Sequence, residues 1–127
     1  WECNFAGKVA LGVAIDYAHD LGLASIQECV ISLAAQLRER LSTIDGVTVW
    51  DEGVDKCGIV TFTHARVSPF GLQKAAAAAG INVSVSDGSG MMLDFTRRGL
   101  TAVVRSSVHY YNNDAELEQF THLVASL

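Results

Sequence analysis

The chain has 127 residues, which suits one compact domain with a hydrophobic core and leaves little room for two. Its formal net charge is −5, with 14 acidic and 9 basic residues. Because no basic stripe is available to neutralise phosphates, we expect no nucleic-acid partner and no anionic membrane partner. No apolar run has the length that a bilayer-spanning helix needs.

Half of the residues are hydrophobic and the mean hydropathy is +0.26, which is high for a small domain. This excess predicts a surface that is buried against another domain or a second subunit. The chain begins at Trp1 and enters a helical apolar pattern within a few residues, which is typical of a piece of a longer protein. Its three cysteines are odd in number and widely spaced, which favours a reducing, cytoplasmic location over a disulfide framework.

The first half of the chain predicts two helices and a hairpin. A helix is expected over 5–20, where apolar residues surround the helix instead of forming one stripe, which indicates burial on more than one side. An amphipathic helix follows over 25–43. Strands are expected over 47–50 and 58–64, and the polar turn between them predicts an antiparallel hairpin.

The next helix has clear signals at both ends. Ser68 is suited to the N-cap and Pro69 to the first helical position. Gly80 follows an alanine run and predicts a left-handed cap that ends the helix. A strand over 81–86 and a loop over 86–90 come next.

The last part of the chain completes the predicted sheet. The segment 91–100 has no clear pattern, whereas 101–111 is the most strand-like segment of the chain. Asn113, with Glu116 three residues later, resembles a capping box that begins a last helix. We therefore predict a single α+β domain over 1–127, with helices on one face of a mainly antiparallel sheet of three to four strands.

Motifs for cofactors and metals are weak. The glycine-containing loop at 86–90 lacks the third glycine of a dinucleotide loop and the Lys-Ser/Thr of a phosphate loop. The four histidines lie on separate predicted elements without ligand spacing, so no metal site is predicted. Cys29 and Cys57 are interpreted as small apolar fillers, and Cys3 lies too near Trp1 for an interpretation.

Arg105 is the strongest functional candidate because it interrupts the apolar strand 101–111. Arginine stays protonated, so a buried guanidinium without an anion is costly. The anion is either an internal acid, which makes Arg105 structural, or the carboxylate of a ligand, which makes it functional. Ser107 and His109 share its predicted strand face, and such a half-polar face can line a cleft. Three classes stay open: part of an enzyme, a small-molecule-sensing regulatory domain and a plain interaction module.

Several segments together resemble a known family. They read GINVSVS at 80–86, RGL at 98–100 and VVRSSVHYYN at 103–112, followed by an acidic helix. This order resembles the C-terminal domain of class V aminotransferases, fold-type I pyridoxal phosphate enzymes that include cysteine desulfurases, selenocysteine lyases and isopenicillin N epimerase-like proteins. Residues 1–18 resemble the long helix that leads out of the large domain in that family. The resemblance implies that Arg105 binds the α-carboxylate of an amino-acid substrate, for which a bidentate guanidinium is suited.

One departure from the family concerns sulfur chemistry. Cysteine desulfurases carry a mobile nucleophilic cysteine in the loop that corresponds to 86–92, and this chain has none there. Because sulfur abstraction through a persulfide needs a thiolate, the resemblance favours transamination or another reaction at the α- or β-carbon. A cysteine desulfurase, selenocysteine lyase or epimerase relative is the first alternative, and a stand-alone regulatory or interaction domain is the second.

A second departure concerns the cofactor. The family's cofactor lysine and phosphate-binding residues belong to the large domain, and Lys8, Lys56 and Lys74 lack the surroundings of a Schiff-base lysine. We therefore expect pyridoxal phosphate in the intact parent enzyme, but no bound cofactor, no catalytic residue and no activity in this chain alone. The expected partners are the missing large domain of the same protein, a small amino-acid substrate and a second copy in a homodimer.

Overall fold

A four-stranded antiparallel sheet forms the centre of the computed structural model, which describes residues 3–127. The strand order is β1-β2-β4-β3, so the two outer strands are the first and third in the chain. The strands are β1 (Val47–Val49), β2 (Ile59–His64), β3 (Ser84–Asp87) and β4 (Ala102–Ser107). The predicted hairpin of β1 and β2 and the predicted antiparallel sheet are both confirmed.

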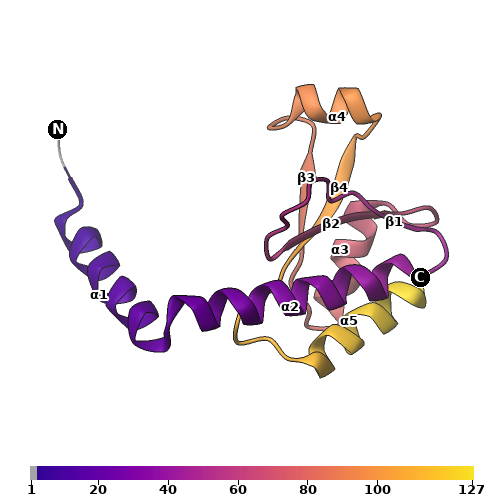
Figure 1. Cartoon of the computed structure of the whole chain (residues 1–127). Helices are drawn as coiled ribbons and strands as arrows, with labels where there is room; N and C mark the ends of the chain where they lie inside the picture. The colour runs from indigo at the N-terminus through magenta and orange to yellow at the C-terminus, as the bar shows by residue number, and fades with distance from the viewer. Residues whose placement is uncertain (1–2) are drawn as a thin grey trace.

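Three helices cover one face of this sheet, as predicted. In Figure 1, α2 and α5 run side by side below the strands and α3 lies behind them, while α4 sits at the far end of β3 and β4. The helices of the described residues are α1 (Phe5–Leu21), α2 (Leu23–Ser42), α3 (Pro69–Ala78), α4 (Met92–Arg98) and α5 (Asp114–Ala125). The α+β architecture with helices on one face is therefore confirmed.

The hydrophobic core lies between the sheet and these three helices. Alternate residues of β2 and β4 point toward the helices and are fully buried, among them Phe62 and Val104. The ring of Phe62 meets that of Phe120 on α5 edge-on, with ring centroids 6.1 Å apart. The buried members of this cluster are Leu33, Ala34, Leu37, Leu41, Val60, Phe62, Leu72, Val104, Leu117, Phe120 and Val124.

Two predicted helix starts are confirmed because their signals are local. The Ser68 hydroxyl accepts a hydrogen bond from the Gly71 backbone N–H at 3.1 Å, which satisfies one of the free donors of α3. Asn113 and Glu116 form a reciprocal capping box at the start of α5, with hydrogen bonds of 3.1 Å and 3.0 Å. Both helices begin at the residue that follows the predicted cap.

The strand ends differ from the predictions. β3 begins at Ser84 instead of residue 81, because the Val83 carbonyl accepts a hydrogen bond from Gln73 of α3 at 3.1 Å and residues 81–83 stay with that helix. β4 ends at Ser107 instead of residue 111, because the Asn112 side chain accepts from the His109 N–H at 2.8 Å and closes a turn. The undecided segment 91–100 contains the short helix α4.

The first helix leads away from the rest of the molecule (Figure 1). α1 and α2 meet at an angle of 80°, and Gly22 between them has φ +89°, a conformation that favours glycine. No residue of α1 is buried, although many of its side chains are apolar. Phe5, Val9 and Val13 are each at least 66% exposed. The sequence predicted that α1 is buried on more than one side, but no other part of residues 3–127 buries it. None of their helices is by itself long and apolar enough to cross a bilayer.

Candidate functional site

Arg105 lies in the middle of β4 on the sheet face opposite the three covering helices. Its neighbours along the strand, Val104 and Ser106, point to the helices and are buried, whereas Arg105 itself is exposed. The prediction that the guanidinium is buried in an apolar strand is therefore wrong. The side chains of a strand alternate between its two faces, and α2, α3 and α5 cover the face of Val104 and Ser106. On the other face Val103 is buried, so that face is exposed at Arg105 and Ser107 but not along the whole strand.

The guanidinium of Arg105 has no ion pair among residues 3–127. The salt bridges of these residues involve other arginines, namely Arg38, Arg40, Arg66, Arg97 and Arg98. The interpretation of Arg105 as one half of an internal ion pair is therefore contradicted for this part of the chain. An exposed, permanently charged guanidinium without an internal anion is free to bind an anion from outside.

Small hydroxyl-bearing residues flank Arg105 on the neighbouring strands. Thr61 of β2 and Ser84 of β3 are its direct cross-strand partners, so their side chains share its face of the sheet. Ser107, two residues further along β4, also shares this face and is exposed, as predicted. His109 does not, because β4 has ended and its ring packs near Tyr110 and Tyr111 instead. Arg105 is exposed between these short side chains.

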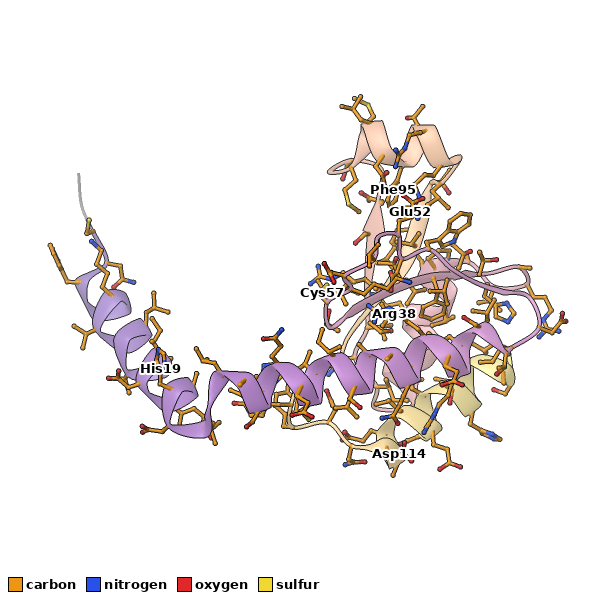
Figure 2. All side chains as sticks on the ribbon, viewed as in Figure 1. His19, Arg38, Glu52, Cys57, Phe95 and Asp114 are labelled. Atoms are coloured by element: carbon orange, nitrogen blue, oxygen red, sulfur yellow. The ribbon has the colours of Figure 1, made fainter. Side chains whose placement is uncertain are left out.

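A buried ion pair fixes Thr61 beside Arg105. The Thr61 hydroxyl donates to Asp51 Oδ1 at 2.6 Å, and the Thr61 backbone N–H donates to the same oxygen at 2.8 Å. Asp51 Oδ2 accepts from Arg38 Nε at 2.7 Å. Figure 2 shows Arg38 between α2 and the strands, where its Nη2 also donates to the carbonyls of Cys57 and Ile59. The hydroxyl proton of Thr61 is thus committed, which leaves its oxygen as an acceptor toward the open face.

The loop at 86–92 begins with a tight polar turn. The Ser89 hydroxyl donates to Asp87 Oδ1 at 2.5 Å and the Ser89 backbone N–H donates to the same atom at 3.0 Å. These hydrogen bonds, the side-chain one first, hold the pKa of the Asp87 carboxyl below its usual value. Met91 and Met92, at the other end of the loop, are exposed.

Charged residues hold α4 against the β1–β2 connection. Arg98 donates to Asp94 at 3.0 Å and to the Trp50 carbonyl, and its guanidinium carbon lies 5.5 Å from the Trp50 ring centroid. The hydrogen bond from Arg98, followed by that from Arg97, holds the pKa of the Asp94 carboxyl below its usual value. Glu52, labelled in Figure 2, pairs with both arginines, with N–O distances of 3.4 Å to Arg97 and 3.5 Å to Arg98. The loop at 86–92 is thereby held at a defined end of the sheet.

Cys29 and Cys57 lie on elements other than β4, the strand of Arg105. Cys57 is exposed in the β1–β2 connection, so its interpretation as an apolar filler is wrong. Cys29 is half-buried, with its sulfur 3.9 Å from the Tyr110 carbonyl oxygen. Among residues 3–127, no group of three His, Cys, Asp or Glu side chains is placed to hold a metal ion.

The residues of this chain do not fit pyridoxal phosphate. A lysine that forms a Schiff base reacts as the free amine, which burial or a neighbouring cation favours. Lys8 on α1, Lys56 in the β1–β2 connection and Lys74 on α3 are all exposed and lie on separate elements. None of these three lysines therefore has the surroundings of a Schiff-base lysine.

Thr61 and Ser84 are site residues that the sequence did not reveal. Each is one of many hydroxyl residues in the chain, and only the strand register places both beside Arg105. The predicted strands over 58–64 and 81–86 contain them, so a correct strand pairing would have found the group. That pairing depends on contacts between segments far apart in the chain.

With the sheet, its helices and the exposed arginine in place, the class of protein follows from a family comparison. A model of the family "Aminotransferase class-V" matches residues 3–120, so this chain belongs to the class V aminotransferase family. The predicted family is confirmed.

The individual relatives are named as cysteine desulfurases. A probable cysteine desulfurase of Methanothermobacter thermautotrophicus is 29% identical over 118 residues, which are 91% of this chain and 30% of that protein. One of Halalkalibacterium halodurans is 32% identical over 113 residues, which are 89% of this chain and 27% of that protein. This chain therefore spans less than a third of the length of these curated relatives.

Solved structures establish the fold. The apo structure of a cysteine desulfurase from Thermococcus onnurineus NA1 matches with a TM-score of 0.91 at 22% identity, over 99% of this chain and 32% of the other. The cysteine desulfurase CsdA from Escherichia coli matches with a TM-score of 0.89 at 19% identity, over 99% of this chain and 31% of the other. Nearly the whole chain thus has the fold of one part of these larger proteins.

Proposed function

We propose that this chain is the small C-terminal domain of a pyridoxal phosphate-dependent class V enzyme that transaminates an amino-acid substrate. One observation carries the proposal: Arg105 stands exposed on the open sheet face, without an ion pair among residues 3–127 and between the short side chains of Thr61 and Ser84. A guanidinium in this setting suits a bidentate contact with the substrate carboxylate.

The role of this chain in the proposed enzyme is to bind and orient. Arg105 donates two parallel hydrogen bonds to the carboxylate, which fixes the position of the α-carbon. The Ser84 hydroxyl donates to the Arg105 carbonyl at 3.4 Å and the Thr61 hydroxyl donates to Asp51, so both oxygens are left as acceptors, which suits the Arg105 guanidinium and not the carboxylate. The cofactor supplies an electron sink when bound and, in this proposal, is held by residues outside this chain.

The exposed apolar helix α1 is proposed to pack against the large domain of the same protein in a cytoplasmic homodimer. The 127-residue chain alone is proposed to be one domain that lacks catalytic activity. Titration of this chain with pyridoxal phosphate, followed by absorbance, should produce no saturable band. A saturable band that disappears when Lys56 or Lys74 is replaced by methionine would place a cofactor site in this chain.

The carboxylate role is tested by Arg105→Gln in the intact enzyme. Loss of two charge-assisted hydrogen bonds should lower kcat/KM for the amino acid about 10²- to 10³-fold. Arg66→Gln is the matched control, because Arg66 is also exposed and, among residues 3–127, its ion pair is the 4.0 Å contact with Asp45. Equal kcat/KM values for the Arg105→Gln variant and the parent enzyme would refute the role.

A desulfurase or lyase is the second candidate, and the names of the relatives favour it. The cysteines of this chain are Cys3, Cys29 and Cys57, so the loop at 86–92 offers no thiolate for a persulfide. Incubation of the intact enzyme with cysteine, a keto acid as amino acceptor and a reductant separates the two activities. Transamination yields a keto acid without sulfide, whereas release of sulfide and alanine would favour the second candidate and overturn the first.

A further inference from the structure

Thr61 lies where the edge strand β1 has ended and leaves β2 without a strand partner. β1 ends at Val49, and the Trp50 N–H still donates to the Thr61 carbonyl at 2.8 Å. In a regular antiparallel ladder the Thr61 N–H would donate to the Trp50 carbonyl in return. That carbonyl accepts from Arg98 instead, and the Thr61 N–H donates to Asp51 Oδ1 at 2.8 Å. The carboxylate of Asp51 thus takes the place of the next strand residue.

The same carboxylate also binds the side chain of Thr61. Its Oδ1 accepts from the Thr61 hydroxyl at 2.6 Å, and its Oδ2 accepts from Arg38 Nε at 2.7 Å. A contact of 2.6 Å is in the range of charge-assisted O–H···O⁻ hydrogen bonds. Because hydrogen bonds in a chain polarise one another, the Thr61 oxygen becomes a better acceptor for a cationic donor.

Arg105 is the cationic group next to this oxygen. Thr61 and Arg105 are cross-strand partners. The N–H and the carbonyl of Thr61 both point to the β1 side, so the two residues form a non-hydrogen-bonded pair, whose side chains lie closer together than those of a hydrogen-bonded pair. Ser84, the partner of Arg105 on β3, has its own hydroxyl proton directed to the Arg105 carbonyl at 3.4 Å.

The guanidinium of Arg105 has more donors than a substrate carboxylate can use. Arginine has five N–H donors, of which a bidentate carboxylate takes two. The donors of Arg105 are uncommitted, because the side-chain hydrogen bonds that arginines donate among residues 3–127 come from Arg38, Arg40, Arg97 and Arg98. Once a substrate covers the guanidinium, each N–H that faces the sheet needs an acceptor, since an unpaired buried donor is costly.

We propose that Thr61 is a positioning residue for Arg105, with its hydroxyl oriented by Asp51. When Arg105 binds the substrate carboxylate, Thr61 Oγ1 accepts an N–H that faces the sheet, and two other N–H groups are directed to the carboxylate. The inference rests on the carboxylate role proposed for Arg105 and adds to it the group that orients the guanidinium. Thr61 itself does not touch the substrate in this arrangement.

Thr61→Val in the intact enzyme tests this role, because valine has the shape of threonine without the hydroxyl. L-Cysteine with a keto acid is the probe, since both candidate functions consume cysteine. We expect KM to rise about three- to ten-fold and kcat to change less than about two-fold, because the contact is made in the ground state and the transition state alike. Thr61→Ser keeps the hydroxyl and should restore KM. A KM that Thr61→Ser raises as much as Thr61→Val does would contradict the role of the hydroxyl.

Thr63→Val is the matched control on the same strand and face. Thr63 lies two residues along β2, where its hydroxyl oxygen accepts from Trp50 Nε1 at 2.9 Å. Its loss also removes a hydrogen bond, yet it should leave KM for cysteine unchanged. An equal rise in KM for Thr63→Val would show that any loss of a hydroxyl on this face acts through the fold and would overturn the inference.

A double-variant cycle separates this inference from the proposed function. In the Arg105→Gln background, Thr61→Val should change kcat/KM less than about two-fold, because Thr61 acts through Arg105. A loss from Thr61→Val that is as large in this background would overturn the positioning role. An unchanged KM for Thr61→Val, beside a clear loss for Arg105→Gln, would overturn the positioning role and leave the carboxylate role intact. An unchanged kcat/KM for Arg105→Gln would overturn both.

Discussion

Replacement of Asp51 by alanine is expected to remove a large part of the stability of this fold. The side chains of Arg38 and Asp51 are only 12% and 10% exposed, and Arg38 Nε lies 2.7 Å from Asp51 Oδ2. Removal of one partner of such a pair leaves an uncompensated buried charge, which costs about 3–5 kcal/mol. Arg38 keeps two carbonyl acceptors, at Cys57 and Ile59, so we expect the lower end, about 3 kcal/mol. For a chain of this length, that loss lowers Tm by roughly 10–15 °C.

Urea unfolding followed by circular dichroism measures this loss, with an unchanged slope as the check that the unfolded state is the same. Asp114→Ala is the control, because the Arg40–Asp114 pair is 32% and 65% exposed and should contribute about 1 kcal/mol or less. The double variant Arg38→Met with Asp51→Ala should regain stability relative to Asp51→Ala alone, since no unpaired charge is left. Similar losses for Asp51→Ala and Asp114→Ala would refute the reasoning.

Further predictions concern the helix cap, the core and the polar turn. Asn113→Ala removes the N-cap of α5 and should cost about 1 kcal/mol in urea unfolding, whereas Asn113→Asp should restore most of it. Leu37→Ala opens a cavity at a residue that is 1% exposed and should cost about 2–5 kcal/mol in the same assay. Ser89→Ala removes the hydrogen bond that lowers the pKa of Asp87, so that pKa should rise toward its usual value in a carboxyl ¹³C titration. Because the pKa of Asp87 is lower in the folded state than in the unfolded state, the carboxylate stabilises the fold above the unfolded pKa. This stabilisation is lost as the pH falls through the folded pKa. Ser89→Ala should therefore make the free energy of unfolding depend less on pH in the acidic range.

The sequence predicted those elements whose signals are local. Ser68 and Asn113 mark their helices correctly because a cap is formed with backbone groups only three residues away. The start of β3 was wrong because Gln73, ten residues before Val83, binds the carbonyl of that residue. The end of β4 was wrong although its signal is local, since Asn112 accepts from the His109 N–H only three residues away. Strand composition carries no such information.

The candidate site was found in part. Arg105 was selected because a charge in an apolar strand suggested burial, yet the buried polar residue of that strand is its neighbour Ser106. The alternation of side chains was predicted correctly for Ser107 but not for His109, because β4 ends before it, and the face that the helices cover is decided by tertiary packing. Thr61 and Ser84 join Arg105 only through the strand register, which no local pattern specifies.

The strand order also determines how quickly the chain can fold. β1 and β2 are consecutive strands, as are β3 and β4, whereas the central pair of β2 and β4 joins segments that are separated by α3, β3 and α4. Closing such a long loop costs entropy before the contacts of Phe62 and Val104 are gained. Formation of this central pair is therefore expected to limit the rate, so that substitutions at Phe62 or Val104 slow refolding more than substitutions in the caps of α3 or α5.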